Sequence, residues 1–282
     1  MDRRWTQSGH LYLVATPIGN LQDMPPRALA VLREADLILA EDTRVSGPWL
    51  RREGVVAPIV SHHQHSPPEQ IQGLMAQLAE GKIVALVSDA GLPAVSDPGQ
   101  AVVEAAWQAG IGISAVPGPS AGVTAFAVSG FSLPMVLWGF LPPRGGARSA
   151  AIGRLAECPA TQVVYEAPGR VLDVMQRLAD AVPERPLLVA RELTKLHEEL
   201  WRGPAARAPS HWAVAPPRGE FTLVLGQQSP QPTTVDWGAL LGLVATHVER
   251  GLSDREAVRR VAEQAGVSRR GLYQRWHGHQ TT

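Results

Sequence analysis

The chain has 282 residues, and its 26 Lys and Arg residues balance its 26 Asp and Glu residues, so the formal net charge at pH 7 is zero. Such a chain has no overall positive field, and a nucleic-acid-binding surface would have to be local. Cys158 is the only cysteine, which excludes an intramolecular disulfide and suits a reducing compartment. Residues 1–9 lack the apolar core of a secretion signal, so we expect a cytoplasmic protein.

The uncharged stretch at residues 105–143 does not predict a membrane span, although its length would suffice to cross a bilayer. Pro117, Pro119 and Pro134 interrupt it, and its pattern is that of a strand, a loop, a buried helix and a second strand. We therefore expect no membrane association.

The first half of the chain repeats an apolar strand, a loop and a helix. Short aliphatic runs predict strands at 11–15, 37–40, 83–87 and 113–116, with another near Pro58. Helical patterns follow at 23–34, 68–80 and 99–109, the first with Asp23 as its N-cap. This alternation predicts an α/β domain, residues 10–138, built on a parallel sheet with right-handed crossovers.

The composition changes near residue 139, where glycine and proline predict a linker up to Gly146. Strands at 162–166, 187–191 and 220–226 and a helix at 169–181 then predict a second α/β domain, residues 139–228. Its later strands lack clear intervening helices, which favours a mixed sheet. After a linker at 227–234, the segment 235–280 is predicted to be helical.

The loops that follow the strands of the first domain carry the candidate ligand-binding residues. Ligands of parallel α/β sheets bind beyond the carboxyl ends of the strands, so these loops are expected to meet at one edge. They are residues 16–20, 41–44, 88–99 and 117–120. Asp89 has no evident capping role and is a ligand candidate, whereas Asp97 could equally cap the next helix. No G-x-G-x-x-G or Walker sequence follows the first strand, so a dinucleotide or kinase site is not expected.

Charged residues at other strand ends leave two interpretations open. Asp42 and Arg44 could position a substrate or take part in proton transfer, or they could form a buried ion pair. Lys195 is one of only two lysines, which indicates a specific role beside the alternative of a surface ion pair. The three histidines at 62, 63 and 65 lack further ligands at metal-binding spacing, so no metal site is expected.

Seven motifs, in order along the chain, make it resemble a known superfamily. They are A-T-P-I-G-N-L at 15–21, A-E-D-T-R at 40–44, V-S-D-A-G at 87–91, S-D-P-G at 96–99, P-G-P-S-A at 117–121, G-F-L-P at 139–142 and A-R-E-L-T-K at 190–195. With these motifs the chain resembles, over nearly its whole length, the tetrapyrrole methylases and, within them, the bacterial 16S ribosomal RNA cytidine 2′-O-methyltransferases.

The resemblance implies a two-domain α/β fold, a homodimer, and a site for S-adenosyl-L-methionine in the cleft between the domains. Matched to the family's motifs, the cofactor-binding residues would be Pro17, Ser88, Asp89, Ala90, Ser120, Ala121, Tyr165 and Gly219. The activity would be methylation of the ribose 2′-hydroxyl of a cytidine in the decoding centre of 16S ribosomal RNA, within the small ribosomal subunit. Departures from the family pattern at Leu92 and Gly169 bear on substrate positioning more than on cofactor binding.

Methyl transfer to a hydroxyl requires alignment of that group and removal of its proton, and it needs no metal. The candidate proton acceptors are Glu41, Asp42, Glu192 and Glu220, and the sequence does not choose among them. Positive charge for RNA is expected from Arg44, from Lys195 and from an acid-free group at the linker, Arg144, Arg148 and Arg154.

The C-terminal segment resembles a helix-turn-helix, with Gly266 at the turn and Ser268 as N-cap of the second helix. Arg269, Arg270 and Arg275 follow without an acid between them, which makes this segment a second candidate RNA contact. The alternative is a small packing unit at the edge of a dimer.

The sequence is also compatible with two other functions. A small-molecule methyltransferase acting on a tetrapyrrole would share the superfamily motifs, but the basic linker and the RNA-subgroup motifs disfavour it. A non-enzymatic DNA-binding regulator would use the helical tail, but the intact cofactor loops disfavour it.

Overall fold

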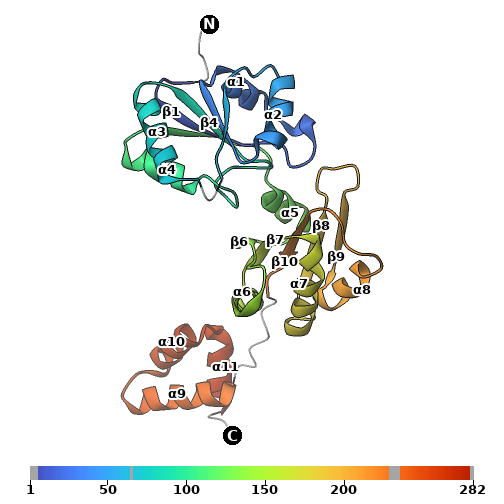
Figure 1. The fold of residues 1–282 in the computed structure, drawn as a ribbon. Helices are drawn as coiled ribbons and strands as arrows, with labels where there is room; N and C mark the ends of the chain where they lie inside the picture. The colour runs from blue at the N-terminus through green and yellow to red at the C-terminus, as the bar shows by residue number, and fades with distance from the viewer. Residues whose placement is uncertain (1–5, 64–65, 229–235, 280–282) are drawn as a thin grey trace. The chain divides into compact units, whose positions relative to one another are not determined.

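The computed structural model describes residues 6–63, 66–228 and 236–279. The chain divides into two compact units, Met1–Gln228 (unit 1) and Ser229–Thr282 (unit 2). Unit 1 contains two five-stranded sheets with helices packed on them, and the described residues of unit 2 form three helices (Figure 1). In the parts of the chain that the structure describes, no helix is long and apolar enough to cross a membrane.

The first sheet is fully parallel, as the sequence predicts. Its order is β3 (Ile59–Ser61), β2 (Leu37–Ala40), β4 (Ile83–Val87), β1 (His10–Val14) and β5 (Gly112–Val116). Alternate residues of each strand point to opposite faces. Tyr12 and Val14 pack with α1 (Pro26–Glu34) and α2 (Thr43–Arg52), and Leu11 packs with α3 (Pro68–Ala79) and α4 (Gln100–Gln108).

The second sheet is mixed, which the sequence also predicts. Its order is β6 (Met135–Phe140), β7 (Thr161–Glu166), β10 (Phe221–Leu225), β8 (Pro186–Arg191) and β9 (Glu199–Pro204). Only the β6–β7 pair is parallel among these neighbours. One face packs on α6 (Gly145–Glu157), α7 (Pro168–Ala181) and α8 (Ala208–Trp212), and α5 (Ala121–Ser129) covers the other. We call the parts of unit 1 around the two sheets the first and second lobes.

The expected boundary at residue 138/139 is wrong, because β6 runs across it and pairs with β7 of the second lobe. α5 also belongs to that lobe, since Ala125 and Phe126 pack against residues of β7, β8 and β10. The predicted linker up to Gly146 is likewise wrong. Gly145 and Gly146 begin α6, whose later residues Ala151, Ile152 and Leu155 are buried, so tertiary packing outweighs the low helix propensity of the two glycines.

The first helix also begins differently from the expectation. Asp23 ends a short 3-10 turn, η1 (Leu21–Asp23), and does not cap α1. The N-cap position belongs to Pro25, with Pro26 as the first helical residue. The φ of proline is fixed near the helical value, so Pro26 suits the first helical position, and α1 begins without a side-chain N-cap.

Unit 2 has its own hydrophobic core, formed by α9 (Trp237–Glu249), α10 (Asp254–Ala265) and α11 (Arg269–His279). Val244, Val258, Val261, Leu272 and Trp276 are buried in it. The helical prediction for 235–280 is confirmed over the residues described there, and most of the predicted linker at 227–234 lies outside them, as do residues 235, 280 and His65.

Candidate active site

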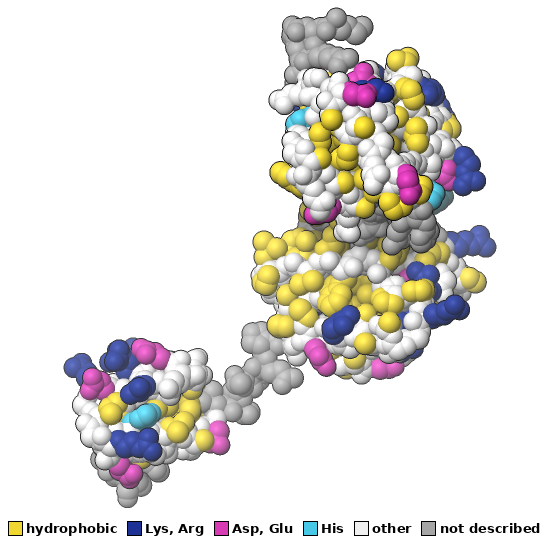
Figure 2. Space-filling model, turned by 60° about the vertical axis from the view of Figure 1, so that its left-hand side comes forward, with side chains coloured by type: hydrophobic (Ala, Val, Ile, Leu, Met, Phe, Trp, Pro, Cys, Tyr) yellow, Lys and Arg dark blue, Asp and Glu magenta, His cyan; other side chains and the backbone are white. Residues whose placement is uncertain are grey.

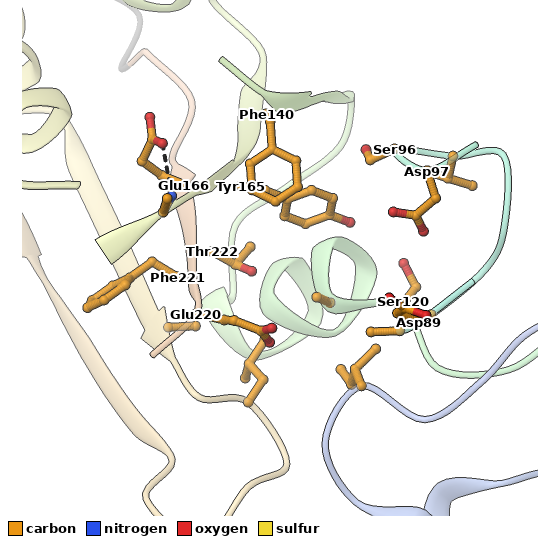
Figure 3. Close-up of a pocket in the computed structure, with 18 of the residues that line it drawn as sticks. Asp89, Ser96, Asp97, Ser120, Phe140, Tyr165, Glu166, Glu220, Phe221 and Thr222 are labelled. Atoms are coloured by element: carbon orange, nitrogen blue, oxygen red, sulfur yellow. Dashed lines mark hydrogen bonds between the residues drawn. The ribbon is translucent and has the colours of Figure 1, made fainter. Parts of the chain in front are cut away.

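A cavity of about 390 Å³ lies in unit 1, where loops of the first lobe face strand ends of the second (Figure 3). The first lobe contributes the loops after β1, β2, β4 and β5, which parallel topology brings to one edge. The second lobe contributes the ends of β6, β7 and β8, the start of β10 and residues just beyond these strands. The loops predicted to meet at one edge therefore all contribute to one cavity.

The cavity has apolar walls. Its apolar lining residues include Ile18, Leu92, Val95, Phe140 and Leu193. The rings of Phe140 and Tyr165 lie 5.6 Å apart, centroid to centroid. The side chains of Glu166 and Phe221 point away from the cavity in Figure 3, so these two residues present mainly backbone to it.

Three carboxylates of the first lobe line the cavity: Glu41, Asp89 and Asp97. Burial raises the pKa of each. Repulsion adds to it, from Asp97 and Asp89 on Glu41, from Asp42 on Asp89 and from Asp89 on Asp97. Asp89 Oδ1 accepts hydrogen bonds from the Asp42 amide at 3.2 Å and from Ser46 Oγ at 3.4 Å. No Lys or Arg lies among the described residues that line this cavity, so the group is suited to a cationic ligand.

The junction between α5 and β7 depends on a close approach. The Gly122 amide donates to the Tyr165 hydroxyl at 3.1 Å. A Cβ at Gly122 would lie 2.8 Å from the same hydroxyl oxygen, so a larger residue would displace the Tyr165 ring. Ser120 and Ala121 line the cavity beside this contact, at the start of α5.

Lys195 links two carboxylates next to the cavity. Its Nζ lies 2.8 Å from Glu192 Oε1 and 3.0 Å from Glu220 Oε2. Burial opposes ionisation of Glu192, but hydrogen bonds from Lys195 and from the Glu220 amide outweigh it and lower the Glu192 pKa. A Cβ on Gly19 would overlap the Lys195 stem, so glycine at this position lets the first loop approach this cluster.

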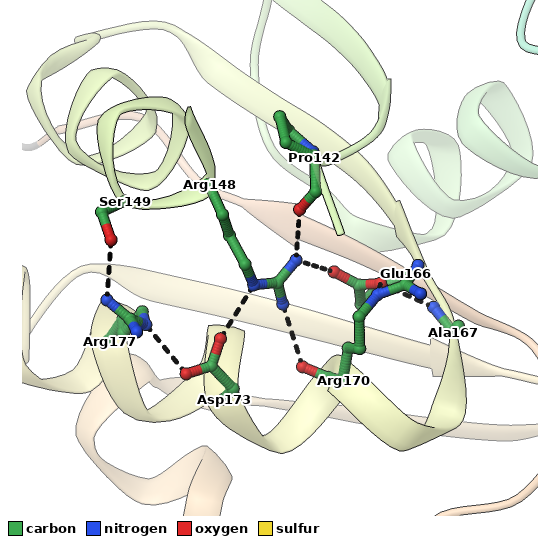
Figure 4. A network of polar contacts seen from close by, with 8 residues as sticks. All are labelled: Pro142, Arg148, Ser149, Glu166, Ala167, Arg170, Asp173 and Arg177. Carbon is green, nitrogen blue, oxygen red and sulfur yellow. Dashed lines mark hydrogen bonds and ion pairs between the residues drawn. The ribbon is translucent and has the colours of Figure 1, made fainter. Parts of the chain in front are cut away.

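A buried ion network holds the end of β7 (Figure 4). Arg148 NH1 lies 2.8 Å from Glu166 Oε2, and Arg148 Nε lies 2.9 Å from Asp173 Oδ2. Arg170 Nε donates to the other Glu166 oxygen at 2.8 Å, and the Ala167 amide donates to that same oxygen at 2.9 Å. The network therefore fixes residues 165–168, which line the cavity.

The four candidate proton acceptors separate into two groups. Glu41 and Glu220 line the cavity. Asp42 and Glu192 are not among its lining residues, and both are held in ion pairs. Hydrogen bonds from Arg44 lower the Asp42 pKa to about 2, and Asp42 also caps α2 through the Arg44 amide. The Asp42–Arg44 pair is thus present, but it is exposed rather than buried as the alternative supposed.

Most of the cofactor-binding candidates lie at the cavity. Asp89, Ala90, Ser120, Ala121 and Tyr165 line it. Three others lie beside it: Pro17 precedes the lining residue Ile18, Ser88 is buried and donates to the Ala90 and Gly91 carbonyls, and Gly219 precedes Glu220. Gly219 has φ +85°, and a Cβ there would lie 2.5 Å from the Glu192 carboxylate.

The arginine group at 144–154 is not one surface. Arg148 is 4% exposed and belongs to the Glu166 network, so its assignment to RNA is wrong. The sequence showed no acid nearby, but Glu166 and Asp173 reach Arg148 from β7 and α7. Arg144 and Arg154 are exposed, and Arg154 lies over the Trp138 ring. Arg44 is exposed too, whereas Lys195 is partly buried.

The sequence does not decide whether Asp97 caps a helix or contacts a ligand, and it does not identify Phe140 as a site residue. α4 begins at Gln100 with Gly99 as its N-cap, so Asp97 caps no helix and faces the cavity instead. Phe140 was read as part of a linker. Three aliphatic residues at 135–137 directly before it are the signal that could have identified it as the end of a strand.

Comparisons with known proteins agree with this architecture. Residues 10–209 match the family model described as Tetrapyrrole (Corrin/Porphyrin) Methylases. Uroporphyrin-III-C-methyltransferase from Thermus thermophilus superposes with a TM-score of 0.54 at 23% identity, covering 77% of this chain and 94% of that one. Diphthine synthase gives a TM-score of 0.59 at 13% identity, covering 77% and 89%. These likenesses confirm the predicted fold class.

Curated relatives are more similar in sequence. Ribosomal RNA small subunit methyltransferase I of Streptococcus pyogenes serotype M1 is 40% identical over 273 residues, 96% of this chain and 95% of the relative. The protein of the same name from Thermotoga maritima is 44% identical over 218 residues, 77% of this chain but 98% of the relative. The chain belongs to the tetrapyrrole methylase superfamily and, within it, to the ribosomal RNA small subunit methyltransferase I family.

Proposed function

We propose that this protein transfers a methyl group from S-adenosyl-L-methionine to the 2′-hydroxyl of a cytidine in the decoding centre of 16S ribosomal RNA. The substrate would be the small ribosomal subunit, in the cytoplasm. Family membership supports methylation of ribosomal RNA. The observation that supports the proposal for this chain is its cavity, which combines apolar walls with three carboxylates from the first lobe and has no Lys or Arg in its described lining.

The residues present fit S-adenosyl-L-methionine. Its sulfonium and ammonium groups are cationic, and Asp89 and Asp97 offer carboxylates whose ionised forms burial penalises until a cation is present. Ile18, Leu92 and Phe140 would hold the apolar surface of the adenosine. When bound, S-adenosyl-L-methionine supplies an electrophilic methyl group.

The chain's own contribution to the chemistry is to orient the ribose hydroxyl and accept its proton. Of the two carboxylates that line the cavity and were candidates, Glu41 has a raised pKa because burial and the charges of Asp97 and Asp89 disfavour its ionised form. A carboxylate with a raised pKa is the stronger base. We therefore assign proton removal to Glu41, and Glu220, which is mostly exposed and paired with Lys195, to positioning of the substrate.

A methyl-transfer assay with labelled S-adenosyl-L-methionine tests the proposal. The acceptors are small subunits from a strain lacking this protein, small subunits from the parent strain, and uroporphyrinogen. Incorporation into the first acceptor alone is the expected result. Incorporation into the tetrapyrrole, or equal incorporation into both kinds of subunit, would contradict the proposed substrate.

A homodimer is part of the proposal. Residues 105–143 contain no charged side chain, yet they expose Val123 and Val128 on α5, Leu133 before β6, and Val136 and Phe140 on that edge strand. Figure 2 shows hydrophobic side chains gathered on the second lobe. An exposed apolar surface of this kind is typical of an interface. A Val123→Lys/Val128→Lys variant should therefore sediment as a monomer where the parent sediments as a dimer.

A further inference from the structure

Unit 2 contains a helix-turn-helix whose geometry is complete. α10 ends at Ala265, and Gly266 follows in the left-handed conformation with φ +63°. The Val267 amide donates to the Ala262 carbonyl at 3.1 Å, which closes the turn. Ser268 then begins α11, since its hydroxyl accepts from the Gly271 amide at 3.3 Å and its carbonyl accepts from Leu272. The core residues Leu272 and Trp276 fix the orientation of α11 against α9 and α10.

The outer face of α11 carries side chains that commonly contact nucleic acids. Its exposed residues with side chains turned away from the core are Arg269, Arg270, Tyr273, Gln274 and His277. Their spacing places them along one side of the helix, opposite Leu272 and Trp276. α11 contains no Asp or Glu, and within the described residues neither Arg269 nor Arg270 forms an ion pair.

Arg275 is the exception among the arginines of this helix. Its guanidinium lies 4.1 Å from the centroid of the Trp237 ring, and it donates to the Gly271 carbonyl at 3.3 Å. Arg275 therefore contributes to the packing of unit 2 and is not part of the outer face.

α10 provides the contrast within the same unit. Two of its three exposed arginines, Arg259 and Arg260, lie one helical turn from Glu263 and Glu256. Charges of opposite sign at i and i+4 partly neutralise each other. In addition, Asp254 and Glu256 occupy the first turn of α10, where acids are favourable, whereas Arg269 and Arg270 occupy the first turn of α11, where cations are unfavourable. An anionic partner on α11 would remove this unfavourable interaction.

We infer that the outer face of α11 binds the phosphate backbone of the ribosomal RNA substrate. The inference rests on the proposed function for the identity of the RNA. Arg269 and Arg270 contact phosphates, and Tyr273, Gln274 and His277 complete the surface. Unit 2 thus increases the affinity for RNA without taking part in methyl transfer.

The test compares the full-length double variant Arg269→Gln/Arg270→Gln with the matched control Arg259→Gln/Arg260→Gln, which removes the same charge from α10. Binding to unmodified small subunits is measured over a series of salt concentrations, together with steady-state kinetics and calorimetry of S-adenosyl-L-methionine binding. For the α11 variant we expect KM for subunits to rise about tenfold with kcat unchanged, and the slope of log affinity against log salt to fall by about 2. The control and the cofactor affinity should change less than about twofold.

Each outcome decides the inference separately from the proposed function. If the parent protein methylates small subunits but the α11 variant retains its KM and salt slope, the face is not an RNA contact. If the two double variants lose affinity for small subunits equally, the loss reflects the change in net charge, and the assignment to α11 is wrong. If the parent binds duplex DNA in preference to small subunits, the partner is wrong. Absence of methyl transfer by the parent would instead overturn the proposed function.

Discussion

Asp89 lies at the end of β4, half-buried, with a pKa that burial raises above the ordinary value. Asp97 and Glu41 share this condition, so the empty site is unfavourable for three negative charges. A bound cation favours the ionised forms of Asp89 and Asp97, the two carboxylates assigned to the cofactor, and lowers their pKa values. Cofactor binding must therefore release protons at mildly acidic pH.

We expect the affinity for S-adenosyl-L-methionine to increase with pH above about 4 and to become constant once Asp89 and Asp97 are ionised in the free protein. The dissociation constant, measured by calorimetry across this pH range, tests the sign. An affinity that falls as pH rises would show that the carboxylates do not face the cationic groups.

Asp89→Asn keeps an oxygen acceptor for the Asp42 amide and Ser46 but removes the charge. The dissociation constant of the cofactor should rise about tenfold, corresponding to about 1.4 kcal/mol. Asp180→Asn on the exposed part of α7 is the control and should have no effect. Equal cofactor affinity in the Asp89 variant and the parent would show that Asp89 does not bind the cofactor.

Glu41→Gln tests the assignment of the proton acceptor. Loss of a general base should lower kcat by roughly 100- to 10,000-fold while cofactor affinity stays within about threefold. Activity of the parent should rise with pH through the raised pKa of Glu41, because only the ionised form accepts a proton. Glu220→Gln should mainly raise KM. If it lowered kcat more than Glu41→Gln does, Glu220 would be the proton acceptor and Glu41 the positioning residue.

The network around Glu166 connects β7, α6 and α7. The sequence predicts β7 and α7 but assigns the first residues of α6 to a linker. Arg148→Met would leave the fully buried Glu166 paired only with the partly exposed Arg170, and breaking a buried ion pair is strongly destabilising. Arg148→Met should accordingly lower the free energy of unfolding by about 3–5 kcal/mol, measured by urea denaturation. Arg177→Met, which removes a half-exposed ion pair with the same Asp173, should cost less than about 1 kcal/mol. Similar losses in the two variants would contradict the structural role given to Arg148.

The regular elements were predictable where a single residue pattern decides them. Continuous aliphatic runs identified β1, β2, β4 and β5, and the motif order indicated the loops of the cavity. Arg148 could not be assigned from sequence, because its partners lie 18 and 25 residues away and only the fold brings them together. Asp97 could not be assigned for a different reason. A helix cap and a ligand residue have the same sequence pattern until the start of the helix is known.

The division into two units has a consequence for the whole molecule. The relative from Thermotoga maritima is matched over 98% of its length by 77% of this chain, a share close to the size of unit 1. Both sheets are complete by Leu225, before unit 2 begins. Truncation after Pro230 should therefore leave a folded core.

For that truncated protein we expect cofactor affinity within about twofold of the parent and a lower kcat/KM on small subunits, since unit 2 and its α11 face are removed. Calorimetry and methyl incorporation, measured on the same preparation, check both parts. Full activity would show that unit 2 has no role in substrate binding, and an insoluble core would show that the division at Gln228 is wrong.

The central claim is ribose methylation of ribosomal RNA, and its chemical product tests it most directly. 16S ribosomal RNA is isolated from a strain lacking this protein, before and after incubation of its small subunits with the purified protein and S-adenosyl-L-methionine. Complete alkaline hydrolysis leaves intact only the linkage 3′ of a 2′-O-methylated residue. We predict one new alkali-resistant dinucleotide containing 2′-O-methylcytidine, from the decoding centre, and none with the Glu41→Gln variant. Methylcytidine released as an alkali-sensitive mononucleotide would place the methyl group on the base and contradict the account.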